Sequence, residues 1–273
     1  NSQTLGTPQL NILKGLKADV VAMQEFHYTS TSNGTDTAAA FREMIDATFG
    51  TNYVYFREDG YSLPNGIISR YPIVASGSWD DPYVSNRGFA WAQINLPGTN
   101  DLYVVSVHLL TSSSTTRNSE AAAIKTRVQA DFPSDAWVIV AGDMNTDSRG
   151  EAAISTFTTF LSDSPIPTDA ESGGDPDTNL SRGKPYDYVL PSFSMTNTLT
   201  SVVFPSHTFP KGLVFDSRVY TPLSEVSPVQ FSDSTSCQHM GILKDFLVPT
   251  LEAGALLAVS PSSDFSSSAM RFS

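Results

Sequence analysis

The feature that most constrains the fold is an apolar run at residues 136–141, AWVIVA, which leads directly into the polar sequence GDMN at residues 142–145. A strand that is apolar on both faces has to be covered on both faces, as happens in the middle of a sheet that is packed between other layers. The run therefore predicts a layered protein of the α/β type with this strand in its core.

The rest of the chain alternates helix-like and strand-like patterns. Helices are predicted at residues 10–17, 37–49, 118–131 and 151–161. Strands are predicted at residues 19–24, 53–57, 66–69, 88–96, 102–109, 186–190 and 241–248. Some of these strands are close enough in sequence to pair as neighbours, so mixed sheets covered by helices fit better than a purely parallel sheet. We expect one domain over residues 1–250 and a Ser-rich tail or linker over residues 251–273.

The charge balance bears on the class of partner. The formal net charge is −12 and the isoelectric point is near 4.6. Tight, nonspecific binding of nucleic acid needs clustered cations that displace condensed counterions, so no stable nucleic-acid complex is expected. An acidic nuclease that binds its substrate weakly through a metal remains compatible with this charge.

Cysteine use and hydropathy bear on the compartment. Cys237 is the single cysteine, so no internal disulfide can form, and no run of about 18 apolar residues predicts a membrane span. A Lys-poor, Ser/Thr-rich composition and the glycosylation sequons at Asn33 and Asn179 favour a secreted or periplasmic, soluble protein. We expect it to be a monomer.

The first chemical motif is the GDMN sequence. Gly142 permits a tight backbone, while Asp143 and Asn145 are two residues apart and point the same way from an extended chain. Asp143 can orient or deprotonate a water, and Asn145 can donate a hydrogen bond to a phosphate oxygen. The alternative is an ordinary turn, in which Gly, Asp and Asn are common.

Two further strands end in polar residues. The sequence DVVAMQEF at residues 19–26 delivers Glu25, and one carboxylate is enough to start a Mg²⁺ site because Mg²⁺ keeps several waters and binds substrate phosphate. The sequence VSVHL at residues 105–109 places His108 in an apolar strand. A lone carboxylate can also be simply solvated, and a histidine in such a strand can be a hydrogen-bonded core residue.

The last two motifs suggest a pair. Asp187 lies in PYDYVL between aromatic residues, and His239 opens the strand in QHMGILKDF. A partly buried carboxylate needs a partner, and a histidine that meets it gains a raised pKa and a defined orientation. The hypothesis is an Asp187–His239 pair in which His239 acts as general acid or base or donates to phosphate.

Taken in order, these motifs resemble the endonuclease/exonuclease/phosphatase superfamily, the fold of DNase I. The motifs are QE after an apolar strand, NGIISRYPI, SVHL followed by Arg117 and Glu120, GDMN, YDYVL and QHMGILKDF. The resemblance covers roughly residues 8–248. It implies a four-layered α-β-β-α sandwich of two mixed sheets flanked by helices.

The resemblance also implies roles for individual residues. The implied catalytic residues are His239, Asp143, Asn145, Asp187 and His108. The implied substrate-binding residues, with solvated surface as the alternative, are Arg70, Asn86 and Arg87. The implied metal ligands are Glu25 and, beside the catalytic histidine, Gln238.

The sequence departs from the family pattern at two points. Members usually open with a strand that carries an asparagine metal ligand, and no such strand precedes the first predicted helix, so we expect an open gap in one sheet. Gln238 stands where the family usually has an aspartate, and a neutral amide weakens any second metal site. We therefore expect one tightly held metal at most.

These observations predict a hydrolase of phosphodiester bonds that depends on Mg²⁺ or Mn²⁺, most simply a nuclease-type enzyme acting on DNA or RNA. One alternative is a lipid or small-molecule phosphodiesterase or phosphatase of the same superfamily, which the acidic charge favours. Another is an inactive binding module that keeps the fold, which the two departures favour.

Overall fold

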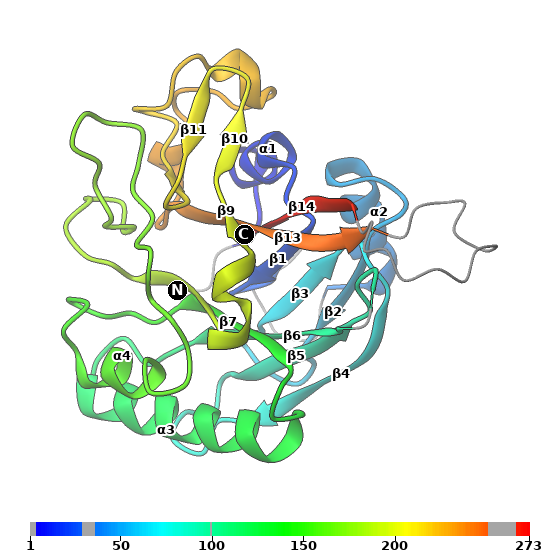
Figure 1. Ribbon diagram of the computed structural model, residues 1–273, viewed down its shortest axis with the longest axis vertical. Coiled ribbons are helices and arrows are strands. Elements are labelled where there is room, and N and C mark those ends of the chain that lie inside the picture. The colour runs from blue at the N-terminus through cyan, green and yellow to red at the C-terminus, as the bar shows by residue number, and fades with distance from the viewer. Residues whose placement is uncertain (1–3, 29–35, 99, 251–265) are drawn as a thin grey trace.

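The computed structural model describes residues 4–28, 36–98, 100–250 and 266–273. Two sheets face each other, and helices cover their outer faces (Figure 1). The predicted four-layered arrangement of two mixed sheets is confirmed. Asn33 and residues 251–265 of the predicted tail lie outside the described residues.

One sheet has seven strands and the other has five. The order in the larger sheet is β12-β13-β14-β1-β3-β2, with β9 also paired to β13, and in the smaller sheet β4-β5-β6-β7-β8. The strands of the larger sheet are β1 Val20–Met23, β2 Val54–Arg57, β3 Gly66–Ser69, β9 Leu199–Thr200, β12 Leu213–Phe215, β13 Gly241–Thr250 and β14 Ser266–Phe272. Those of the smaller sheet are β4 Ile73–Asp80, β5 Gly88–Ile94, β6 Leu102–His108, β7 Trp137–Asp143 and β8 Asp187–Pro191. A separate hairpin consists of β10 Val202–Phe204 and β11 His207–Phe209.

Four α-helices and three short 3-10 helices complete the described fold. The α-helices are α1 Thr7–Leu16, α2 Ala38–Thr48, α3 Ser114–Asp131 and α4 Ala152–Phe157. The 3-10 helices are η1 Phe193–Thr198, η2 Leu223–Val226 and η3 Ser234–Ser236. None of the helices in the described part of the chain combines the length and apolar character that crossing a membrane requires.

The core between the sheets forms from side chains that alternate along the strands. Val104 and Ile139 of the smaller sheet pack against Val20 and Phe246 of the larger one. The opposite face of the smaller sheet, including Val140, packs on α3 and α4. Both faces of the smaller sheet are therefore covered, which explains why the strand at 136–141 is apolar throughout.

β7 lies inside the smaller sheet and ends at the chemistry-bearing residues. It pairs with β6 in parallel and with β8 antiparallel, and all of its residues are buried. The register aligns His108, Asp143 and Asp187 in one row across the three strands. Strand pairing thus brings three separate sequence motifs together at one end of the smaller sheet.

The edge strand β4 has no counterpart in the sequence prediction. Its sequence, IVASGSWD, contains small polar residues, and its side chains alternate between half-buried or exposed positions, with Trp79 the one buried residue. An edge strand with one face in solvent carries only a weak apolar signal. Its partner β5, with mostly buried residues, was predicted.

The expectation for residues 266–273 was wrong, because the structure places a strand there rather than a tail. β14 lies between β13 and β1 (Figure 1), antiparallel to the first and parallel to the second. Met270 and Phe272 are buried in the core between the sheets, and Arg271 forms an ion pair with Asp245 at 3.0 Å. The larger sheet therefore continues from β13 through β14 to β1.

Lys244 on β13 is a charged side chain in this core. It is 1% exposed, and its Nζ atom has no hydrogen-bond partner among the described residues. Burial lowers the pKa of Lys244 to about 8. Because the unfolded chain keeps an ordinary lysine pKa, the folded protein binds fewer protons between pH 8 and about 10.4. Its stability therefore rises with pH in that window and is lower below pH 8, where the buried ammonium is charged.

Replacing Lys244 with Met is expected to raise the free energy of unfolding at pH 7 by on the order of 2–3 kcal/mol, since it removes the cost of burying a charge. Urea unfolding at pH 7 and pH 9.5 measures the effect, and the gain should shrink at the higher pH. Lys211→Met, at an exposed position, is the control. A variant that is less stable than the wild type at pH 7 contradicts this account.

Candidate functional site

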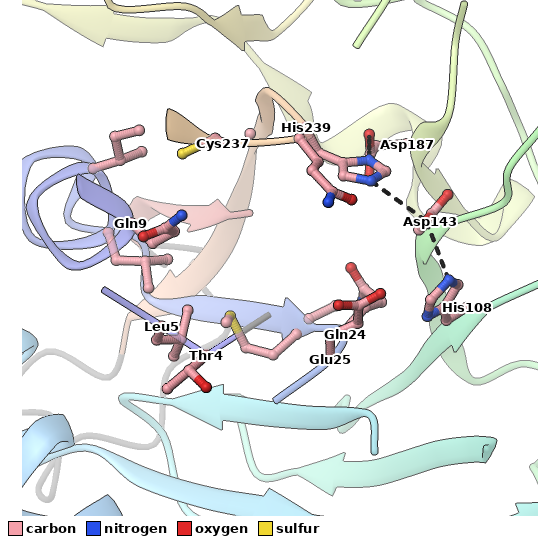
Figure 2. Close-up of a pocket in the computed structure, with 16 residues that line it drawn as sticks. Thr4, Leu5, Gln9, Gln24, Glu25, His108, Asp143, Asp187, Cys237 and His239 are labelled. Carbon is pink, nitrogen blue, oxygen red and sulfur yellow. Dashed lines mark hydrogen bonds and ion pairs between the residues drawn. The ribbon is translucent and has the colours of Figure 1, made fainter. Parts of the chain in front are cut away.

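The polar ends of four strands and the segment before β13 meet around one cavity of about 200 Å³. Figure 2 shows Gln24 and Glu25 at the end of β1, with His239 across the hollow. The predicted site residues that line the cavity are Glu25, His108, Asp143, Asp187, Gln238 and His239. Six residues from distant motifs thus share one hollow.

His239 and Asp187 form the predicted pair. The Nδ1 atom of His239 lies 2.9 Å from Oδ2 of Asp187. Burial alone would lower the pKa of His239, but the carboxylates of Asp187 and Asp143 outweigh it and raise the pKa to about 10. At neutral pH the ring is an imidazolium, and its Nε2 atom can donate a hydrogen bond toward the cavity.

Asp143 lies between the two histidines. Its Oδ2 atom is 3.4 Å from Nε2 of His108 and 3.7 Å from Nε2 of His239. Burial raises the pKa of Asp143 to about 7, although His239 draws it down. A carboxylate whose pKa is near neutrality can take up a proton from water and release it again.

His108 is neutral and buried. It is 4% exposed, and burial together with the positive charge of Arg87 holds the pKa of His108 well below its usual value. Its Nδ1 atom has no hydrogen-bond partner among the described residues. A neutral imidazole that faces Asp143 can donate from one nitrogen only, which orients Asp143 without adding charge.

Asn145 makes its side-chain hydrogen bonds within the protein. Its Nδ2 atom donates to the carbonyl oxygen of Leu109 at 2.9 Å and to Oδ2 of Asp143 at 3.1 Å. Both amide hydrogens are therefore used within the protein, and Asn145 is not among the described residues that line the cavity. In this arrangement Asn145 holds Asp143 in place rather than offering a donor to phosphate.

Gly142 has the tight backbone that the sequence predicted. Its φ is +137°, and an added Cβ would collide with the carbonyl oxygen of Val107 and lie 2.6 Å from Nε2 of Gln24. This close approach brings the end of β7 against the end of β1. Only glycine fits at such a point.

A hydrogen-bond chain that the sequence analysis missed links the two sheets here. Gln24 Nε2 donates to Oγ of Ser106 at 2.9 Å, and that hydroxyl donates to the carbonyl oxygen of Met23 at 2.8 Å. Ser106 is the polar residue of an otherwise apolar stretch, VVSV, and this interruption is the signal that could have identified it. The chain sets the position of Glu25, the next residue along.

Arg117 and Glu120, which the resemblance included, brace the segment after His108. Arg117 donates to the carbonyl oxygens of Leu110 and Thr111, both at 3.0 Å, and Glu120 accepts from the backbone N–H of Leu110. Arg117 is also paired with Glu151. These contacts hold α3 and the end of β6 together beneath the cavity.

The three predicted substrate-binding residues do not line the cavity. Arg87 is 5% exposed and lies behind His108, with Nη1 3.4 Å from the His108 carbonyl oxygen and Nε 3.0 Å from Oδ1 of Asn86. Arg70 follows β3, so it lies beside the start of β1 rather than its end, and it pairs with Asp19 at 2.9 Å. The structure therefore does not bring Arg70 to the site.

The donor set suits a hard divalent cation. Ligand atoms of Asp143, Asp187 and His239 lie within 4.8 Å of one another, and Glu25 adds a carboxylate on the same cavity. Oxygen-rich sites of this kind favour Mg²⁺ or Mn²⁺ over softer metals.

Comparison with known proteins agrees with this geometry. The model of the Endonuclease/Exonuclease/phosphatase family matches residues 9–233. The chain belongs to this family. Members of the family are metal-dependent phosphoesterases. No curated protein matches the chain significantly.

Solved structures of the endonuclease/exonuclease/phosphatase family share the fold. A protein of this family from Beutenbergia cavernae superimposes with a TM-score of 0.58 and 17% identity, over 88% of this chain and 65% of that one. A family protein from Leptotrichia buccalis gives 0.53 and 19%, over 85% and 90%. Humanized TDP2 of D. rerio gives 0.50 and 18%, over 74% and 87%. This chain spans less than two thirds of the Beutenbergia protein, and at these identities the likeness concerns the fold alone.

Replacing Gly142 with Ala is expected to destabilise the protein by about 2–4 kcal/mol, because the methyl group meets backbone and the backbone angle is unfavourable for alanine. Thermal and urea unfolding measure the loss. Gly150→Ala is the matched control, since its added Cβ lies 3.6 Å from its nearest neighbour, Oγ of Ser148. Equal stability of the two variants would show that β7 and β1 are not in close contact at this point.

Proposed function

We propose that this member of the endonuclease/exonuclease/phosphatase family hydrolyses phosphodiester bonds with the help of a divalent metal. The observation that carries the proposal is the convergence of an Asp187–His239 pair, an Asp143 carboxylate of raised pKa and the Glu25 carboxylate on one cavity. Attack of water on a phosphodiester requires a positively charged hydrogen-bond donor, a base and a metal ligand around one cavity.

The chain's own residues divide the work. Asp143 orients the attacking water and accepts its proton as the new P–O bond forms. His239, as imidazolium, donates a hydrogen bond to a phosphate oxygen and so stabilises the negative charge of the transition state. The ester P–O bond breaks, and the leaving oxygen takes a proton from solvent. The products are a phosphomonoester and an alcohol.

A divalent metal, Mg²⁺ or Mn²⁺, would be held by Glu25 together with oxygen atoms of the nearby side chains and water. It would supply neutralising charge to the phosphate and to the leaving oxygen. Gln238 is exposed beside His239 and offers a neutral amide oxygen. This supports one tightly held metal rather than two.

The sequence favours nucleic acid as the substrate, and this is a separate and more specific proposal than hydrolysis of a phosphodiester. A nuclease that engages DNA or RNA weakly, through the metal, is compatible with a net charge of −12. The alternatives are a lipid or small phosphoester substrate, or a module that has lost activity. The experiment below separates activity from inactivity first.

The full chain is expected to hydrolyse bis(p-nitrophenyl) phosphate with Mg²⁺ or Mn²⁺ and to lose this activity in EDTA. Metal should also raise the melting temperature, because a ligand that binds only the folded state stabilises it. Glu25→Gln should lose the melting shift and the activity together. Plasmid DNA in the same panel tests the nuclease proposal. A chain with neither hydrolysis nor a shift is an inactive module.

Replacing His239 with Ala is expected to lower kcat by about 10² or more, because the transition state loses its charged donor. Initial rates at saturating metal measure the effect. His207→Ala is the control, since His207 lies on β11 and does not line the cavity. An Ala variant within a few-fold of wild type at position 239 refutes the assigned role, provided that its melting temperature is unchanged.

A further inference from the structure

The cavity has two unlike sides. One side carries the carboxylates and imidazoles described above. The other is apolar, and Figure 2 shows Leu5 on this far side of the hollow from Asp143 and His108. The apolar residues that line it are Leu5, Ile12, Leu13, Ala22, Met23 and Cys237. The polar side suits the phosphate, and the apolar side has no part in the reaction as proposed.

The helix α1 and the strand β1 contribute most of the apolar side, through Ile12 and Leu13 and through Ala22 and Met23. Leu5, Ile12 and Leu13 are each only half-buried, so part of each side chain faces the cavity rather than the protein core. Leu13 also lines a second hollow, of about 170 Å³, which continues past Ala22 to Gly241 and Ser273. The two hollows share Leu13, Ala22, Met23 and Gly241, so space extends from the phosphate side past Leu13 and between the two sheets, with apolar atoms on its wall.

The charges at the site do not suit a polyanion. None of the described residues that line the cavity is lysine or arginine. Three basic side chains outside the lining have partners within the protein: Arg87 is buried behind His108, Lys184 is paired with Asp147, and Arg218 is paired with Asp216. Nucleic acid binds through cations arranged along successive phosphates, and such a row is missing from the described cavity wall.

We propose that the substrate is a phosphodiester with a single phosphate and one hydrocarbon arm, and that this arm lies against Leu13 on α1 and its apolar neighbours Ala22 and Met23 on β1. This inference rests on the proposed function and names its substrate class. Removing apolar surface of both the arm and the wall from water contributes the binding energy. The phosphate meets the metal and His239, and the rest of the substrate extends out of the cavity.

A series of diesters with one leaving group tests the proposal. Methyl, butyl and octyl p-nitrophenyl phosphate release the same phenol, so only the second arm differs. Burial of one methylene changes kcat/KM by about fourfold. The full chain with Mg²⁺ or Mn²⁺ is expected to show kcat/KM at least about tenfold higher for the butyl than for the methyl diester, mainly through KM. The proposal is overturned if kcat/KM does not change with the length of the alkyl arm, or if it falls as the arm becomes longer.

Two variants locate the arm. Leu13→Asn keeps the size of the side chain but makes the wall polar, and it should reduce the butyl-to-methyl ratio at least threefold. Leu10→Asn is the matched control, because Leu10 is half-buried on the same helix and does not line either hollow. Its ratio should equal that of the wild type. A ratio that Leu13→Asn leaves unchanged overturns the assignment to α1.

Gly241→Val is a second test of where the arm binds, for use if Leu13→Asn does not fold. A Cβ at Gly241 meets its nearest atoms, Cδ1 of Leu16 and Oγ of Ser273, at 3.8 and 4.0 Å, so the backbone accepts it. The added side chain reduces the space between β13 and Leu13, because Gly241 lines both hollows. The advantage of the octyl arm over the methyl arm should therefore fall, and an unchanged advantage counts against the proposal.

Failure of the proposed hydrolysis and failure of the proposed substrate class give different results. If none of the diesters, bis(p-nitrophenyl) phosphate included, is hydrolysed with metal, the proposed function itself fails. If they are hydrolysed without arm preference, or if plasmid DNA is cleaved with the higher kcat/KM, the reaction stands and the apolar substrate class is overturned. With arm preference present, cleavage of sphingomyelin vesicles indicates a bilayer source for the substrate. Their resistance indicates a soluble one, and either result supports the proposal.

Discussion

The site depends on the close approach of the two sheets at one end. Two side-chain contacts span the sheets there, from Gln24 to Ser106 and from His239 to Asp187. Between them, Gly142 lets the backbone of β7 approach Gln24 more closely than any other residue would allow. The carboxylate of Glu25 belongs to the larger sheet and that of Asp143 to the smaller one, so neither sheet alone forms the site.

Burial and the close opposite charges together give these groups their chemical character. Asp143 and His239 have pKa values of about 7 and about 10, and both values depend on the same low-dielectric surroundings and on each other. Substitution of one therefore shifts the other, and the two titrate as a coupled pair.

Much of the candidate site could be predicted from the sequence, because each candidate side chain lies in or close to a strand with a strong apolar signal. Asp143 follows a fully apolar run, Asp187 is the first residue of β8, and His239 lies two residues before β13. Where the prediction concerned contacts rather than positions, it was less accurate. The side-chain amide of Asn145 donates to Asp143 and Leu109, and Arg70 forms an ion pair with Asp19 near the start of β1. Local spacing cannot show which partner a flexible polar side chain meets.

The layered fold and the positions of the candidate site residues are visible in the chain, because burial on both faces requires continuous apolar runs. Long-range packing fixes the place of β14, whose few apolar residues sit in a Ser-rich stretch and gain their burial from β13 and β1. It also decided the apolar wall of the cavity, since α1 comes to face His239 only when the sheets pack. Contacts between residues far apart in the chain leave no periodic pattern, and the packed core alone creates them.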